Sequence, residues 1–229
     1  MNKVFKHLSL AAAVSCATFA MQANAYEAGD WIVRAGVAHV APDDSSDPLA
    51  LNGGAISGSE VEVDSDTQLG LTVTYMINSD FGVELLAATP FTHDITADTG
   101  ALGLGKVDAG ETSHLPPTLS AVWYPMGSAG QIAPYVGAGI NYTMFFEEDV
   151  SSDLEGVLGS ADLELDDSIG LALQVGVDVQ LNDNWQVNAS LRWIDIDTDA
   201  EITAGANTIT IDNVEIDPWV YQLNVGYKF

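Results

Sequence analysis

Four charged residues lie in segments whose pattern predicts the direction of their side chains: Arg34, Glu84, Asp178 and Arg192. Each lies in a segment where large apolar residues alternate with small or polar ones, and each falls on the small, polar side, as Lys228 also does. In a strand, alternate side chains point to opposite faces, so these charges would share one interior. An isolated buried charge costs several kcal/mol. We therefore expect a luminal ion-pair network of the four residues that plugs the interior, and an ion-selectivity filter is the alternative.

Catalysis has little support in the sequence. His39, His93 and His114 are the histidines beyond the first 25 residues, and no Gly-x-Ser-x-Gly elbow or zinc-ligand spacing accompanies them. The acidic stretches 147–149 and 162–167 could hold divalent cations, but they lack the spaced ligands and turn glycine of a calcium loop. We expect no enzyme, no cofactor and no metal site, and we interpret the acidic stretches as a solvated surface.

Period-two alternation predicts the elements that carry these residues. In the last segment Trp219, Tyr221, Leu223 and Val225 alternate with polar or small residues, and the sequence ends on Phe229. One face suits lipid and the other suits a polar interior. Eight segments follow this rule: about 30–40, 67–76, 81–93, 113–124, 135–146, 169–181, 185–193 and 219–229.

The face that carries small and polar residues distinguishes a soluble barrel from a transmembrane one. A soluble lipocalin-like barrel would point its large apolar residues inward, but the other face here is too small to fill a core. Strands that face lipid must close into a barrel, because unpaired edge groups are costly there. Short connections alternate with long ones, at about 43–66, 94–111, 147–167 and 195–217, which hold 27 of the 33 acidic residues. We predict an all-β, eight-stranded, antiparallel, up-and-down transmembrane β-barrel with short periplasmic turns, long acidic external loops and both termini in the periplasm.

The N-terminus has the layout of a secretory signal peptide. Two lysines, an apolar run and small residues follow one another: Lys3 and Lys6, then 8–21, then Ala23 and Ala25. The run is short for a membrane anchor, which needs roughly 20 apolar residues. We expect residues 1–25 to be cleaved, together with Cys16, leaving a single barrel domain at 26–229. That domain keeps four basic and 33 acidic residues, a formal charge of −29, which excludes nucleic-acid binding.

Several motifs resemble those of the outer membrane protein W (OmpW) family. They occur in family order and cover most of the chain after residue 25: TQLGL (67–71), GVELLAATPF (82–91), HLPPTL (114–119), PYVGAGINY (134–142), DIDT (195–198) and DPWV (217–220). The resemblance implies an eight-stranded outer-membrane barrel with a narrow apolar path, and passage of small hydrophobic molecules with sideways release into the bilayer. Members of the family are also described as bacteriocin receptors and surface antigens. Relatives tend to carry an aromatic or apolar residue where Arg192 stands, and an inward-facing guanidinium would narrow or polarise the path at that level.

Two further sets of residues bear on transport. Leu86, Ile194 and Ile196 are expected to line an apolar path at mid-height. Three prolines, which lack the N–H that a strand ladder needs, lie near the external end of one hairpin: Pro90, Pro116 and Pro117. They either end the strands at the second long loop or leave a lateral opening in the wall.

Two function classes follow. The first is a channel-like protein of the bacterial outer membrane that gives small hydrophobic molecules passive passage with lateral release. The second is a structural or receptor barrel without transport, used in adhesion or by bacteriocins or phages. The expected partners are the lipid bilayer, small hydrophobic molecules, and the barrel-assembly machinery, which would recognise the C-terminal strand ending at Phe229.

Overall fold

The computed structural model describes residues 26–103, 105–126 and 130–229, and the predicted signal peptide lies outside them. Eight strands form a closed antiparallel barrel in which each strand pairs with the next, and the last pairs back with the first. They are β1 (Trp31–Ala41), β6 (Asp66–Met76), β7 (Phe81–Ala88), β10 (Thr118–Trp123), β11 (Ile132–Val150), β13 (Ser168–Gln180), β14 (Trp185–Ile194) and β17 (Trp219–Lys228). The predicted eight-stranded up-and-down barrel is confirmed.

Alternation sends large apolar groups outward along the barrel. On β13, Leu173 and Val175 are 54% and 53% exposed, while their neighbours Ala172 and Gln174 are only 2% and 4% exposed. Because one wall must face lipid and the other a narrow lumen, a one-residue shift of any strand would reverse both faces. The lipid-facing assignment from sequence therefore excludes a one-residue shift of any strand.

Outward aromatic rings form a belt near the end with the short turns. Trp31 packs on Tyr75 with ring centroids 5.0 Å apart, and Trp185 packs on Tyr227 at the same separation. Such rings prefer the boundary between hydrocarbon and water. The belt marks the level at which the barrel leaves the membrane on its periplasmic side.

No helix within the described residues is long and apolar enough to cross a membrane.

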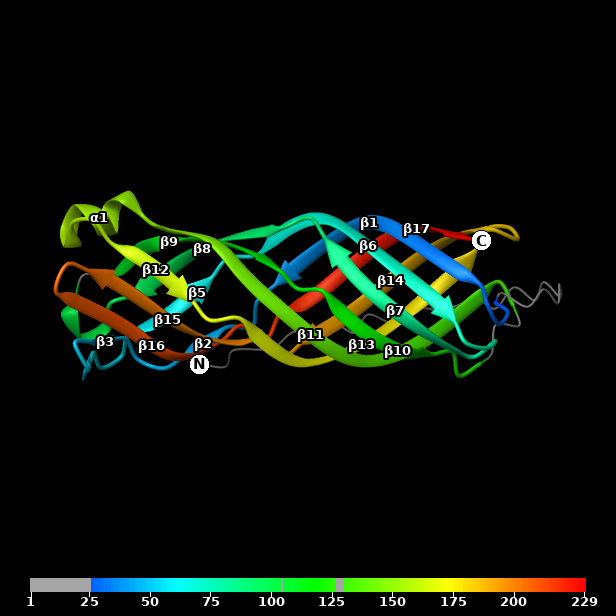
Figure 1. Cartoon of the computed structure of the whole chain (residues 1–229), viewed down its shortest axis with the longest axis horizontal. Coiled ribbons are helices and arrows are strands. Elements are labelled where there is room, and N and C mark those ends of the chain that lie inside the picture. Colours follow the sequence, from blue (N-terminus) through cyan, green and yellow to red (C-terminus); the bar gives the residue numbers. More distant parts are fainter. Residues whose placement is uncertain (1–25, 104, 127–129) are drawn as a thin grey trace, which may run out of the picture.

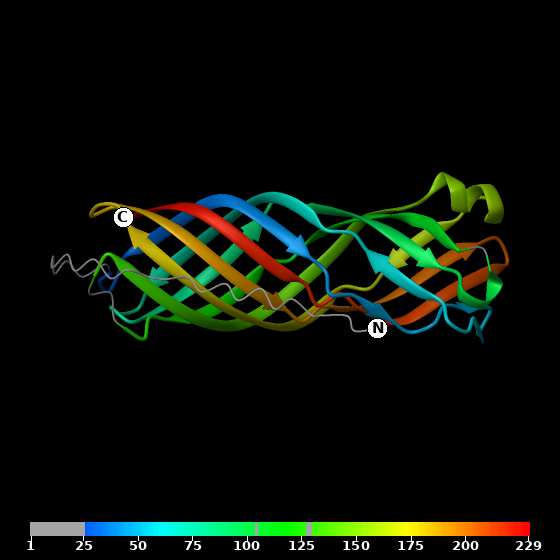
Figure 2. The ribbon, with the colours of Figure 1, turned by 180° about the vertical axis from the view of Figure 1, so that it is seen from behind.

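The long acidic connections are rich in strands instead of being irregular. They extend the barrel into an external half, which lies at one end of the elongated molecule together with α1 (Figures 1 and 2). Its elements are β2 (Ser45–Ser46), β3 (Ala50–Leu51), β4 (Gly54–Ala55), β5 (Glu60–Val63), β8 (Phe91–Asp98), η1 (Gly100–Leu102), β9 (Lys106–Leu115), α1 (Ser152–Leu158), β12 (Asp162–Leu165), β15 (Asp197–Ala204) and β16 (Asn207–Glu215).

Two predicted strands are each divided in two at their prolines. The segment predicted at 81–93 forms β7 and β8, which are separated by Thr89 and Pro90. The segment predicted at 113–124 forms β9 and β10, which are separated by Pro116 and Pro117. Proline has no N–H to donate to a ladder, so strand pairing stops at these positions.

Candidate binding site

The lumen of the barrel holds the four charged residues singled out in the sequence, and the structure brings them together. Arg34 lies 3.1 Å from Glu84 and 2.7 Å from Asp178, and Arg192 lies 2.9 Å from Glu84. All four side chains are buried. Two arginines balance two carboxylates, so the network carries no formal net charge.

Asp178 is the most heavily hydrogen-bonded member of the network. It accepts two hydrogen bonds from Arg34, at 3.1 and 2.7 Å, and one from Tyr124 at 3.1 Å. Tyr26 donates to it at 2.6 Å, and Asn188 donates at 2.8 Å. These hydrogen bonds compensate the buried carboxylate. The same bonds hold the polar side chains that fill the lower lumen in place.

Tyr26 and Tyr124 complete the filling at the periplasmic end. Their rings meet edge to face at 5.0 Å, and Tyr124 also packs on Tyr135. Glycine makes room for this cluster, since a Cβ on Gly176 would lie 2.4 Å from the ring of Tyr135. Lys228, also predicted to be luminal, is partly exposed at this end and lies 3.7 Å from Asp30.

Above the charged network the lumen becomes apolar. Ile194 and Ile196 are buried in one contiguous apolar cluster that also includes Val40, Ala172 and Val220. Leu86, the third residue of the predicted path, is buried as well but lies outside that cluster. The interior therefore changes from ionic to apolar along the barrel axis.

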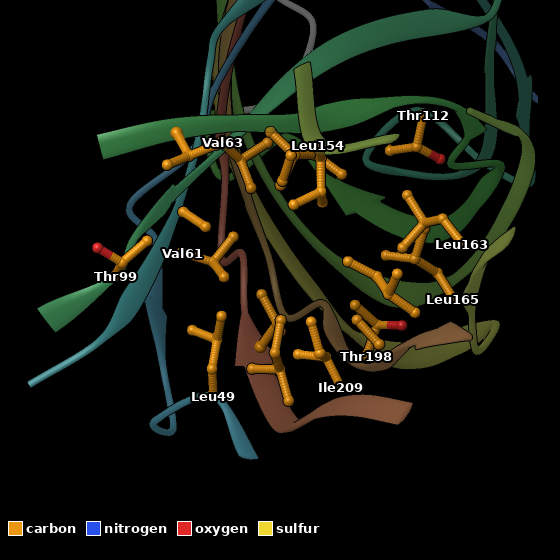
Figure 3. A pocket seen from close by; sticks show the side chains of 18 of the residues that line it. Leu49, Val61, Val63, Thr99, Thr112, Leu154, Leu163, Leu165, Thr198 and Ile209 are labelled. Carbon is orange, nitrogen blue, oxygen red and sulfur yellow. The ribbon is translucent and has the colours of Figure 1, made fainter. Parts of the chain in front are cut away.

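The same apolar cluster continues outward around a cavity of about 250 Å³ in the external half. Figure 3 shows its lining side chains, among them Leu49, Val61 and Leu163. Val61 on β5 and Leu163 on β12 come from the two different sheets, Leu49 directly precedes β3, and α1 adds Leu154. An engineered apolar cavity of roughly 150 Å³ takes up benzene. The cavity is therefore large enough for a small apolar molecule.

Exposed apolar side chains mark the outer edge of the cavity. Leu51, Leu102 and Val157 all line it, yet they are 40%, 55% and 75% exposed. They belong to β3, η1 and α1, three short elements of the external half. The apolar lining therefore continues from the cavity to the solvent-exposed surface.

The three prolines border a break in strand pairing near the other end of the cavity. The β7–β10 ladder ends at the pair Leu86 and Thr118, and the β8–β9 ladder starts at the pair Phe91 and His114. Between these two pairs, neither ladder joins residues 87–90 to residues 115–117. Each edge stays fixed to its other neighbour: Thr89 donates to Leu69, and Pro117 accepts from Tyr142.

The residues that line the cavity were missed by sequence reasoning, although a signal was present. Thr198, Ala200 and Ile202 line the cavity, and together with Ala204 they alternate with exposed residues along β15 and are buried. Acidic residues between them led the segment 195–217 to be assigned to a loop. The alternation itself had the same period as the barrel strands.

One group of acidic side chains has the spacing of a cation site. The carboxylates of Asp195, Asp197 and Asp217 lie within 4.8 Å of one another at the external rim. Burial raises the pKa of Asp197 and of Asp217, and the neighbouring carboxylates raise both further. Exposed acidic groups gather this closely without a metal in many proteins, so we assign no metal site to these three aspartates.

The three histidines lie in two separate places. His39 lies on the outer face of the barrel near the ring of Tyr221, and its Nδ1 lies 2.8 Å from the hydroxyl of Thr67. His93 and His114 stack in the wall of the cavity, 4.8 Å apart. Among the described residues, no hydrogen bond joins any of these histidines to a serine or to an acidic side chain, the arrangement that nucleophilic catalysis needs.

The closed barrel, the lipid-facing apolar wall and the aromatic belt define an outer-membrane β-barrel protein. The chain belongs to the OmpW family, whose model matches residues 27–229. It is 50% identical over 206 residues to outer membrane protein W of Vibrio cholerae serotype O1, covering 90% of this chain and 91% of that protein. It is 44% identical over 224 residues to outer membrane protein W of Escherichia coli strain K12, covering 98% and 100%. The crystal structure of OprG from Pseudomonas aeruginosa matches with a TM-score of 0.83 and 44% identity, covering 89% of this chain and 97% of that one.

Proposed function

We propose that this outer-membrane barrel gives small hydrophobic molecules passive passage from the cell exterior into the outer membrane. The observation that carries the proposal is the apolar cavity, whose surrounding cluster continues into the upper barrel and stops at the ion-paired lumen. A solute would enter between Leu51, Leu102 and Val157. The charged network closes the axial route below it.

The exit lies in the wall between the three prolines. A small apolar solute gains nothing by entering periplasmic water, since roughly 25 cal/mol is lost for each Å² of apolar surface exposed. Neither ladder joins residues 87–90 to residues 115–117, so the wall can separate there with the fewest broken hydrogen bonds. Sideways release there keeps the solute in an apolar medium.

A relative supports this class of solute by its name. A protein of Pseudomonas aeruginosa, 30% identical over 203 residues and covering 89% of this chain, is named "Dibenzothiophene metabolism operon protein PahQ". Dibenzothiophene is an uncharged aromatic compound. The proposal therefore extends to molecules whose surface is almost wholly apolar. No enzyme activity is part of it.

The proposed exit is tested by closing it reversibly. Ala88→Cys and Pro116→Cys are combined and bridged with a reducible bis-methanethiosulfonate reagent, because the predicted mature chain has no cysteine of its own. In intact cells, entry of a small hydrophobic fluorescent reporter should fall on bridging and recover on reduction. The control bridges Leu191→Cys to Tyr221→Cys, two residues paired in the β14–β17 ladder.

Two results would contradict the proposal. Undiminished entry with the bridge complete would eliminate this exit. Entry equal to that of cells without the protein would leave the alternative, a structural or receptor barrel that transports nothing.

A further inference from the structure

A stacked pair of histidines lies in the cavity wall directly beside the break in pairing. His93 on β8 and His114 on β9 have ring centroids 4.8 Å apart and ring planes 16° from parallel. His114 also packs against Phe91 at 5.6 Å and Phe145 at 5.9 Å. Both histidines are 2% exposed. A solute on the proposed route from the cavity to the exit passes this pair.

The hydrogen bond of His93 fixes which of its nitrogens carries the proton. Its Nδ1 contacts the backbone carbonyl oxygen of Asp64. A carbonyl oxygen only accepts, so Nδ1 carries the hydrogen. Burial lowers the pKa of His93, and nearby carboxylates, those of Asp66, Asp64 and Asp94, oppose that shift. In the neutral ring, Nε2 is then a hydrogen-bond acceptor.

That acceptor and two neighbouring polar atoms have no hydrogen-bond partner among the described residues: His93 Nε2, His114 Nε2 and Thr112 Oγ1. His93 and Thr112 face each other in the β8–β9 ladder, so all three side chains share one region of the wall. The other two threonines of the lining, Thr99 and Thr198, donate to backbone carbonyls. Buried polar atoms without partners are rare and costly. This unsatisfied group is therefore a place where a ligand atom would gain a hydrogen bond.

The charge around the pair restricts the ligand further. Burial, and to a smaller extent His93, lowers the pKa of His114 to about 3, so this ring is neutral too. The charged side chains that act electrostatically on the two rings are the carboxylates of Asp64, Asp66 and Asp94, and of these Asp94 follows His93 in β8 and points to the opposite, exposed face of the strand. An anionic ligand would meet repulsion and no cation, whereas a neutral hydroxyl would find an acceptor.

We propose that, among the hydrophobic molecules it takes, the cavity prefers neutral ones that combine an apolar body with one hydroxyl group, and that the hydroxyl donates a hydrogen bond to His93 Nε2 beside the exit. This inference rests on the proposed function, because it specifies the class of solute that the same cavity takes. The apolar body fills the cavity. The hydroxyl is held by the pair of strands that borders the break.

The inference is tested with three probes on the full mature chain in phosphatidylcholine nanodiscs: 1-hexanol, hexane and hexanoate at equal concentration in the bilayer. Isoleucine methyl groups are labelled to report on the cavity through Ile95 and Ile202, and histidine nitrogens are labelled with ¹⁵N. Hexanol should shift the cavity methyl signals and the Nε2 signal of His93, while His39, on the outer face, stays unchanged. Hexane should shift the methyl signals alone, and hexanoate should shift neither.

The outcomes separate the two proposals. Methyl shifts with hexanol and no change at His93 Nε2 would overturn the hydroxyl site and leave hydrophobic passage standing. No methyl shift with either hexanol or hexane would contradict binding in the cavity, and both proposals would fail.

Substitution gives a second measurement. His93→Phe keeps an aromatic ring and removes the acceptor, so the preference for hexanol over hexane should fall about fivefold, the value of one hydrogen bond. His39→Phe is the matched control and should leave the preference unchanged. An unchanged preference in a folded His93→Phe protein would overturn the inference, and the ¹⁵N measurement on the unsubstituted chain decides it if that variant does not fold.

Discussion

At the scale of single residues, Glu84 holds the luminal network together. It pairs with both Arg34 and Arg192, whereas Asp178 pairs with Arg34 alone. Without Glu84, Arg34 keeps a carboxylate, but Arg192 keeps only the amide oxygens of Gln174 and Gln222. A buried cation without a counter-charge is costly, so Arg192 is the residue that depends most on Glu84.

A double-mutant cycle tests whether Arg192 depends on Glu84. Glu84→Gln alone should lower the free energy of unfolding by roughly 3–5 kcal/mol, because it strands the Arg192 guanidinium. Adding Arg192→Leu should recover part of that loss, which makes the two changes non-additive. Urea unfolding of the reconstituted protein measures each variant. Strictly additive losses would mean that water, and not Glu84, compensates Arg192.

At the scale of elements, period-two alternation was sufficient to predict the barrel strands. Each strand meets two uniform environments, so its side chains sort cleanly by size and polarity. The external strand β15 shows the same period, with buried residues such as Ala200 and Ile202 between exposed ones, but acidic residues stand among the exposed positions. Some partners of the external strands lie far apart in the chain; β16, for instance, pairs with β3 as well as with the adjacent β15. Spacing along the sequence could not supply that pairing.

Some residues of the candidate site could be predicted from the sequence, and others could not. The luminal charges and the prolines carried a local signal, since a charge on a small-residue face or a missing donor is visible in one segment. The stacking of His93 on His114 depends on the β8–β9 ladder, in which the two lie on adjacent strands two residues out of register. Sequence reasoning placed both histidines at strand ends and had no means of joining them.

The corner between β16 and β17 gives a pH-dependent prediction. Burial raises the pKa of Asp217, as do Asp195, Glu215 and Asp43. A carboxyl group whose folded-state pKa is raised destabilises the fold once it is ionised, so stability should rise as the pH falls from neutral through that raised pKa. Asp217→Asn should therefore stabilise the external half at pH 7 by roughly 0.5 kcal/mol and weaken the gain at acid pH.

Asparagine is well matched to this test. It can keep the acceptor for the backbone N–H of Ile196, and it tolerates the backbone at Asp217, where φ is 37°. Amide hydrogen exchange in β15 and β16, followed against pH, measures the effect. A variant with the same pH profile as the parent would show that this carboxyl group is fully hydrated.

At the scale of the whole molecule, acidic side chains of the external half repel one another. Acidic residues stand directly opposite one another in its ladders, and cross-strand partners point to the same side of a sheet. The pairs are Glu60 with Asp98, Asp94 with Glu111, Glu111 with Asp149, Glu164 with Glu201, and Asp197 with Glu215. Like charges in these positions destabilise a sheet. The apolar cluster around the cavity must offset that repulsion.

Salt should therefore stabilise the external half and leave the barrel largely unaffected. Between about 0.01 M and 1 M salt the screening length falls from ~30 Å to ~3 Å, which removes most of the repulsion between exposed carboxylates. Protease cleavage within the external strands should slow as salt rises, whereas the luminal network is buried and is screened far less. Glu164→Gln breaks one opposed pair and should reduce the salt dependence, while Glu27→Gln, at the periplasmic end and outside these pairs, should not. If cleavage were equally fast at both salt concentrations, the external half would be held by its apolar cluster with no measurable contribution from charge, and the density of acidic residues would need an explanation outside folding.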